Sequence, residues 1–458
     1  MTSSRGETLA VFGPVVGSFV VAAACLAGLV WDGSGYLFNA IQDGEPLISH
    51  HRYSNLPVLW AVVSASHLTG EPLTLVVLYG LLLAVVPVGA LGLSFYFLRG
   101  TLVPLRVWPV LGILVVALPG QICVMSEATL VMQAFWPVLA ILASGLSVGG
   151  MGWLAVLIPY LFFLHPLSAP LFALGAVLAA GQALVGGHRW RGVAWSVVFS
   201  LSCFARVGFS VATATSYERG EFAWQPNYDA MLGAIYGWPS LMITMLFVMA
   251  WAAVAGELGW LPRRRSEGWF KGATIGFGLA GVIWAAQPEL WAGALGYRRF
   301  VMLLSLPLIG GGLVQFRGIV RDKLVRDDRK DRFRYRLVWP AVAFGVVLTV
   351  QSFAWRADVA RFAHELRAAH GPVVTMAQVP WITRTPLDHW GSSFVALFVQ
   401  GQTPSTLFAL ENASVEAGRI RLYGSDCVAV RDGWFHLSGV LPSAVPTPSD
   451  TLEGISSE

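Results

Sequence analysis

Long apolar runs separated by short polar segments occupy the first 355 residues of this 458-residue chain. Many runs hold about 18 or more residues with few charges, enough to cross about 30 Å of hydrocarbon as a helix. The pattern predicts an all-α polytopic membrane domain over residues 1–355 with eleven spans. The predicted spans are residues 9–30, 72–98, 107–120, 128–147, 151–165, 169–186, 192–212, 233–256, 273–288, 299–316 and 337–355. Within 128–186, SVGGMG and HPLSAP supply the turns.

The pattern changes after Trp355 to that of an ordinary soluble segment. RADVARFAHELRAA has the spacing of an amphipathic helix, while PVVTMAQV and RIRLYG are typical of strands. We therefore predict a small α/β-type domain over residues 356–440, which is long enough for one compact unit. Residues 441–458, rich in Pro and Ser, are predicted to be a disordered tail.

Composition supports the membrane assignment. The chain is 55% hydrophobic and only 12% charged, against roughly 25% charged in soluble domains. Its mean hydropathy is +0.63. The net charge of +4 is small and the basic residues are scattered, which excludes nucleic acid as an expected partner. The four cysteines show no CxxC pair or Cys/His spacing for zinc, and we expect them to pack as small hydrophobes.

The distribution of Lys and Arg predicts the orientation of the spans. If the N-terminus is cytoplasmic, eighteen basic residues fall in inner loops and five in outer loops, and all three lysines fall inside. The first apolar run exceeds the length of a signal-peptide core, so we interpret it as a retained span. We predict a multi-pass protein of the inner (plasma) membrane with a cytoplasmic N-terminus and a periplasmic or extracytoplasmic C-terminus.

The first outer loop, residues 31–70, concentrates ionisable groups between two apolar spans. Tyr36, Leu37, Ala40 and Ile41 fall on one face of a short helix, which could lie flat in the membrane interface. Asp32 stands where the first span ends and this helix begins. It suits an N-cap, because Asp is favoured there, and it equally suits a catalytic base; the two roles are compatible.

This loop resembles the first outer loop of GT-C polytopic glycosyltransferases, which move a sugar from a polyprenyl-phosphate donor to an acceptor. The matching features are WDGSGYLFNAIQDG, with an Asp, a Tyr-bearing helix and a Gly, and the second short apolar helix in NLPVLWAVVSASHL. The resemblance implies an inverting glycosyltransferase (hexosyl- or pentosyltransferase) acting on a cell-envelope glycan, lipid or protein. It implies Asp32 as general base and Glu127, in the next outer loop, as a second catalytic acid. It leaves open whether a divalent metal such as Mg²⁺ or Mn²⁺ takes part.

A lipid-phosphate leaving group requires cations near its oxygens, and Arg offers bidentate contacts. The candidates for binding the donor phosphate are His50, His51, Arg52, Arg298 and Arg299, with Arg206 and Arg219 as weaker ones. The candidates for other substrate contacts are Tyr36, Asp43, Tyr228 and Tyr297. Each has a structural alternative: the YRR motif suits an interfacial anchor for lipid headgroups, and the His pair suits a solvated loop.

Three other functions compete with the glycosyltransferase. A transporter or flippase is disfavoured because acids gather at the outer span ends rather than at mid-membrane, and because no internal repeat is visible. A membrane acyltransferase would favour a buried catalytic His, for which His67 and His165 are the candidates. The fourth hypothesis is a non-enzymatic assembly scaffold.

Overall fold

The computed structural model describes residues 3–30, 32–46, 52–99, 102, 105–116, 127–185, 189–214, 238–257, 260–287, 330–369, 371, 373–387, 391–409 and 434–436. This part of the chain is almost entirely helical. Its α-helices are α1 (Ser3–Ala24), α2 (Asp32–Asp43), α3 (Leu56–Ser66), α4 (Pro72–Phe97), α5 (Val107–Val116), α6 (Glu127–Ala143), α7 (Val148–Leu164), α8 (Ser168–Val185), α9 (Arg189–Thr213), α12 (Trp238–Glu257), α13 (Arg263–Ala285), α16 (Lys330–Ala368) and α17 (Ser392–Gln400). Its 3-10 helices are η1 (Ala27–Leu29), η3 (Tyr53–Asn55), η7 (Met376–Gln378) and η8 (Pro380–Arg384).

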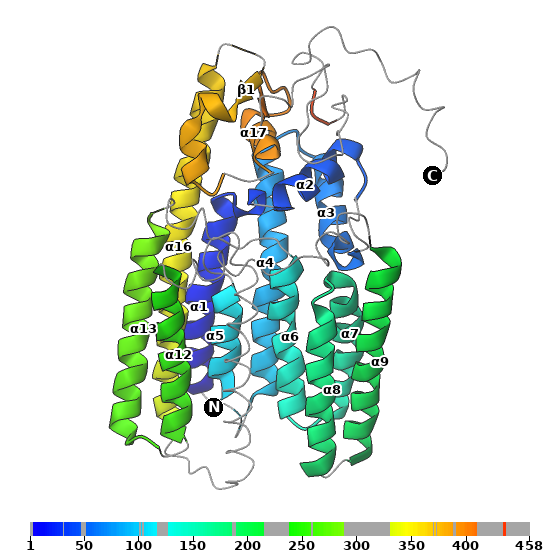
Figure 1. Cartoon of the computed structure of the whole chain (residues 1–458), viewed down its shortest axis with the longest axis vertical. Coiled ribbons are helices and arrows are strands. Elements are labelled where there is room, and N and C mark those ends of the chain that lie inside the picture. The colour runs from blue at the N-terminus through cyan, green and yellow to red at the C-terminus, as the bar shows by residue number, and fades with distance from the viewer. Residues whose placement is uncertain are drawn as a thin grey trace.

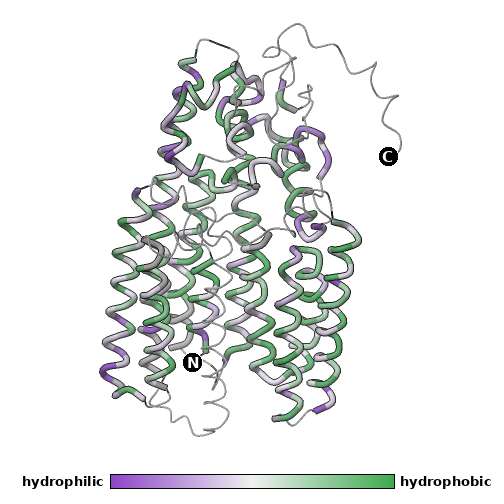
Figure 2. The backbone as a smooth tube through the Cα atoms, in the orientation of Figure 1, coloured by the Kyte–Doolittle hydropathy of each residue, from purple (hydrophilic) through white to green (hydrophobic). Residues whose placement is uncertain are grey.

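The long helices run side by side as one elongated bundle (Figure 1). Helix α1 packs on α4 and α16, α4 packs on α6, and α13 packs on α16. The hairpins α12–α13 and α8–α9 flank this centre on opposite sides (Figure 1). Figure 2 shows hydrophobic residues along most of the height of the bundle and hydrophilic ones mainly at its ends. In a bundle in water, the outward faces of the helices would be polar. Here many large hydrophobic side chains are exposed on those outward faces.

Three described helical segments are long and apolar enough to cross a membrane: Pro72–Phe97, Arg189–Thr213 and Arg336–Ala368. Shorter apolar helices of 10–17 residues stand beside them, among them Leu9–Ala24 and Val148–Leu164. The all-α class is confirmed, and each predicted span except 299–316 coincides with a helix. Residues 299–316 lie outside the described residues, so the number eleven stays a prediction.

Two predicted boundaries were wrong. The span at 9–30 is not one helix: α1 ends at Ala24, Leu26 adopts a left-handed backbone (φ 64°), and η1 follows. A tertiary contact favours this break, because the buried indole Nε1 of Trp355 donates a hydrogen bond of 3.1 Å to the Leu26 carbonyl. The second concerns the boundary at Trp355: residues 356–368 are helical, as predicted, but they continue α16 without a break. A change of composition does not by itself end a helix, and no Pro or Gly stands at Trp355.

Helix α16 is 39 residues long, or about 58 Å, roughly twice the thickness of a hydrocarbon core. Its part beyond Trp355 therefore projects past the bundle, where Figure 1 shows it beside α17 and β1. We call this end of the molecule the cap: α2, α3, α16 beyond Trp355, β1 (Val373–Thr375), η7, η8, α17, β2 (Leu407–Ala409) and residues 434–436. The predicted strand at 372–379 is confirmed only over Val373–Thr375, which pairs in parallel with Leu407–Ala409. The predicted strand at 419–424 and the predicted tail lie outside the described residues.

One buried apolar cluster extends from Val11 in α1 to Phe435 in the cap. Cap and bundle thus share a continuous core. Burial of this surface holds α2, α3 and the C-terminal elements in fixed relation to the helices of the bundle.

Candidate functional site

Helix α2 forms the centre of the cap. The predicted apolar face is buried, with Leu37, Ala40 and Ile41 at 0–1% exposure and Tyr36 half-buried. Protein covers this helix instead of lipid: the Phe38 ring lies 4.9 Å from that of Phe394 in α17. The interpretation of α2 as a helix lying flat on the membrane is therefore wrong for its apolar face. Aromatic residues of the C-terminal part contact α2, where lipid was expected.

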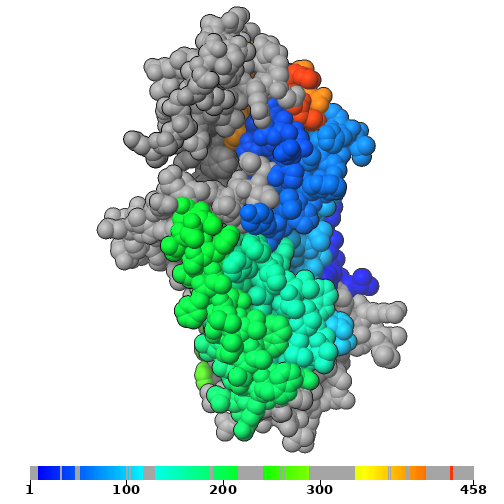
Figure 3. All heavy atoms as spheres, turned by 90° about the vertical axis from the view of Figure 1, so that its right-hand side faces the viewer, coloured from blue at the N-terminus to red at the C-terminus, as the bar shows by residue number. Residues whose placement is uncertain are grey.

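Residues 434–436 pack against α2 and α3. The Phe435 ring stacks on that of Phe38 at 5.5 Å, and its backbone N–H donates a 2.8 Å bond to Gln42 Oε1. The indole of Trp434 donates to the carbonyl of Ser66 at the end of α3, at 3.2 Å. Figure 3 shows these late residues, in orange-red, against the blue surface of α2 and α3. Segments nearly 400 residues apart in sequence thus form one surface.

Asp32 is the first residue of α2, directly after the apolar helix α1 and the turn η1. The Gly33 backbone N–H donates to the Val30 carbonyl at 3.2 Å, which begins the turn into the helix. A helix N-terminus presents unsatisfied N–H groups and the positive end of the helix dipole. Both favour a negatively charged residue in the first turn of α2.

Tyr36 and Arg52 are joined by a hydrogen bond. Arg52 Nη1 donates to the Tyr36 phenol oxygen at 2.9 Å. Tyr36 follows Asp32 by one helical turn, so the two residues lie on the same side of α2. The bond therefore holds a predicted phosphate-binding cation against α2, the helix that Asp32 begins.

The residues next to Arg52 contact the end of α7 that lies near the cap, and α7 in turn packs on α9. The neighbouring Ser54 hydroxyl donates to the Tyr160 carbonyl at 2.6 Å, and the Tyr53 ring meets Phe163 edge-on at 5.6 Å. In the next layer, the Arg206 guanidinium lies 5.5 Å from the centre of Phe162 and 5.3 Å from that of Phe209.

Arg206 is 2% exposed, the lowest exposure of any described arginine. An arginine held between two aromatic faces is stabilised by cation–π attraction while remaining charged. The sequence ranked Arg206 only as a weaker candidate, because its burial depends on how α7 and α9 pack.

The other candidates fall into two groups. Glu127 is the first residue of α6, and Asp43 is the exposed last residue of α2. The remaining candidates lie outside the described residues: His50, His51, Arg219, Tyr228, Tyr297, Arg298 and Arg299.

Acyl transfer was expected to use a buried histidine, and neither of its two candidates is buried. His67 ends α3 and is exposed. His165 ends α7, where its Nδ1 accepts the backbone N–H of Leu167 at 3.1 Å, as a helix-end residue does. Within the described ranges, no three His, Cys, Asp or Glu residues gather as a metal site would need. Cys25 and Cys203 are free thiols.

Comparisons with protein-family models, with curated proteins and with solved structures find no match to this chain.

Proposed function

We propose that this protein is a membrane glycosyltransferase that moves a sugar from a polyprenyl-phosphate donor to a cell-envelope acceptor at the cap. The observation that carries the proposal is the position of Asp32, which begins the helix that also presents Tyr36 to Arg52. A carboxylate and a guanidinium on one short helix–loop unit are the two charges that this reaction needs.

In the proposed reaction the acceptor hydroxyl oxygen attacks the anomeric carbon of the donor sugar. The new glycosidic C–O bond forms as the bond between that carbon and the phosphate oxygen breaks, which inverts the configuration. Asp32 takes the proton of the acceptor hydroxyl. The leaving polyprenyl phosphate carries away the electron pair, and arginine side chains stabilise its charge.

We assign the phosphate contact to Arg52, with Arg298 and Arg299 as further donors and His50 and His51 beside Arg52 in sequence. Arg206 contributes positive potential from its buried place between Phe162 and Phe209. Tyr36, Asp43, Tyr228 and Tyr297 are proposed to contact the sugar or the acceptor, and Glu127 to be the second acid.

The orientation that places the cap outside the cytoplasm is part of the proposal. Helices α9 and α13 begin with Arg189 and Arg263 at the same end of the bundle as the N-terminus (Figure 1). The cap occupies the opposite end. Clustering of Arg at the end that holds the N-terminus is what a cytoplasmic N-terminus favours.

The test is a donor screen in proteoliposomes. Purified protein is supplied with polyprenyl-phosphate sugars, and the release of free polyprenyl phosphate is measured. We expect release with at least one donor when envelope acceptors are present. Movement of an intact donor between leaflets without release would instead identify a flippase, and no release with any donor would remove the basis of the proposal.

A further inference from the structure

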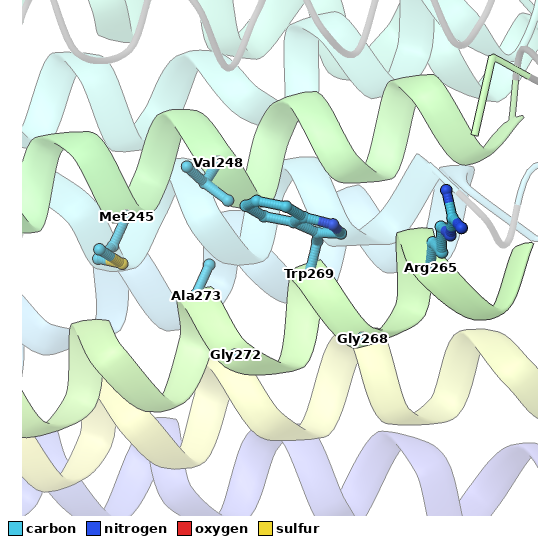
Figure 4. A pocket seen from close by; sticks show the side chains of 7 residues that line it. All are labelled: Met245, Val248, Arg265, Gly268, Trp269, Gly272 and Ala273. Carbon is cyan, nitrogen blue, oxygen red and sulfur yellow. The ribbon is translucent and has the colours of Figure 1, made fainter. Parts of the chain in front are cut away.

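A groove lies between α12 and α13, at the end of the bundle opposite the cap. It has a volume of about 550 Å³ and is lined by Met245, Val248, Arg265, Gly268, Trp269, Gly272 and Ala273. Figure 4 shows Arg265 at one end of the groove, Trp269 and Val248 beside its middle, and Met245 at the other end. The lining is therefore apolar along its length and cationic at one end.

The floor of the groove comes from one stripe of α13. Arg265, Gly268, Trp269, Gly272 and Ala273 follow one another at spacings of three, one, three and one residues, which places them on one face of a helix. A side-chain carbon built at Gly268 or at Gly272 meets no atom within 4 Å. Space above both glycines is therefore open, and their lack of side chains is what makes the groove deep.

Arg265 supplies the only charge among the lining residues. It is exposed, and within the described ranges its guanidinium makes no hydrogen bond or ion pair with another residue. By contrast, the next residue, Ser266, is buried between the two helices, where its hydroxyl donates to Ala252 and accepts from Arg336. Arg265 thus points away from the helix contact and toward whatever fills the groove.

We propose that this groove binds an anionic glycerophospholipid, with the phosphate on Arg265 and an acyl chain along Gly268, Gly272 and Ala273. The distance along α13 from Arg265 to Ala273 is about 12 Å, close to the depth of one leaflet of about 15 Å. Guanidinium is a strong ligand for phosphate, and the apolar lining suits a hydrocarbon chain. The half-exposed indole of Trp269 is typical of a residue at the interface with headgroups.

A second copy of the chain is the competing occupant, because small residues four apart often mark contacts between membrane helices. In a two-fold symmetric pair the same patch of both copies meets at the axis, so Arg265 would lie near its own equivalent. That like-charge contact disfavours self-association and favours an anionic ligand. The donor lipid is assigned elsewhere, since its phosphate is proposed to bind at the cap.

The test uses native mass spectrometry of the purified full-length protein with dioleoylphosphatidylglycerol. Arg265→Gln removes the phosphate ligand, and Gly272→Leu places a side chain in the groove at a position where the added Cβ meets no atom within 4 Å. Arg265→Gln should bind the lipid about fivefold more weakly, the factor that one interfacial basic residue contributes for an anionic lipid. Gly272→Leu should also bind it more weakly, because the added side chain occupies the space proposed for the acyl chain. Dioleoylphosphatidylcholine should bind wild type more weakly than the anionic lipid.

Two matched controls accompany these variants. Arg264→Gln removes the neighbouring exposed charge outside the groove, and Gly152→Leu adds the same side chain at an exposed, open glycine of α7. Both should bind as wild type. If Gly272→Leu does not fold, Gly268→Leu serves in its place. Equal losses in Arg264→Gln and Arg265→Gln, or unchanged lipid binding in the groove variants, would overturn the proposal, as would conversion of a dimer to a monomer by Gly272→Leu.

Discussion

Arg52 Nη1 and the Tyr36 hydroxyl oxygen are 2.9 Å apart, and this hydrogen bond joins the loop after α2 to the helix itself. A hydrogen bond to a charged group contributes about 1.5–3 kcal/mol. Tyr36→Phe removes the acceptor and keeps the ring. If the bond orients Arg52 toward the donor phosphate, donor affinity should fall roughly tenfold or more.

Tyr96→Phe is the matched control for this measurement. Tyr96 also neighbours an arginine, with the Arg99 guanidinium 4.3 Å from its ring centre, but it lies in the last turn of α4 at the opposite end of the bundle. Donor binding should be unchanged there. Equal donor affinity in Tyr36→Phe and wild type would reduce the Tyr36–Arg52 bond to a structural contact.

The contact between Trp355 and Leu26 should be important for stability. Trp355 is fully buried and donates its indole N–H to the Leu26 carbonyl, which also accepts the backbone N–H of Leu29 at 3.0 Å. Trp355→Phe removes the indole donor and also removes ring volume. We expect a loss of about 0.5–1.5 kcal/mol for the hydrogen bond alone, seen as lower thermal stability in detergent. Trp60→Phe, at a residue 63% exposed, should change stability little.

These two relationships show what the sequence could and could not predict. The spacing of Tyr36, Leu37, Ala40 and Ile41 correctly predicted α2 and its buried face, because helical periodicity depends only on local order. It could not predict that Phe394 and Phe435 cover that helix, since periodicity says which face is buried and not by what. The break after Ala24 was missed for the same reason: its partner, Trp355, is more than 300 residues away.

The C-terminal part shows a different limit. The change in composition after Trp355 was visible, but the helix continued through it, because helix continuity depends on backbone hydrogen bonds and not on hydropathy. Likewise the candidate Arg206 was visible as a charge in an apolar run. Its burial between Phe162 and Phe209 depends on how α7 and α9 pack, which no local pattern contains.

Asp358, in the part of α16 that projects past Trp355, should make stability depend on pH. Burial raises the pKa of its carboxyl to about 6, partly opposed by the nearby Arg361. The folded protein therefore holds this proton between the unfolded pKa of 3.8 and about 6, and its stability falls as pH rises through that window. Asp358→Asn removes the dependence, so the variant should be more stable than wild type at pH 8 and similar at pH 4.

Thermal unfolding in detergent at several pH values checks this expectation. Glu365→Gln is not a suitable control, because Glu365 accepts hydrogen bonds from Trp381 and Arg361. The exposed Glu45→Gln is suitable, and it should give the same difference from wild type at both pH values. A wild-type stability that rises from pH 4 to pH 6, with no gain in Asp358→Asn at pH 8, would contradict the assignment.

The orientation of the bundle has its own test. Reporter fusions or accessibility labels at Arg264 and Asp426 should report a cytoplasmic loop and an extracytoplasmic C-terminal segment, respectively. The excess of basic residues in the inner loops is the physical reason. An external Arg264 or a cytoplasmic Asp426 would reverse the orientation. The cap would then face the cytoplasm, which contradicts the proposed transfer of sugar outside it.

The most direct test of the central claim is the rate of sugar transfer by Asp32→Asn. Asn keeps the size and shape of Asp in the first turn of α2, and losing a charge near a helix N-terminus costs only about 0.3–1 kcal/mol, so folding and thermal stability should stay near those of wild type. The variant loses the proton acceptor, and with the donor found by the screen its transfer rate should fall roughly 10²–10⁴-fold. Glu71→Gln, a carboxylate-to-amide change at the N-cap of α4, should retain the wild-type rate. Full transfer activity in a folded Asp32→Asn protein would contradict the account.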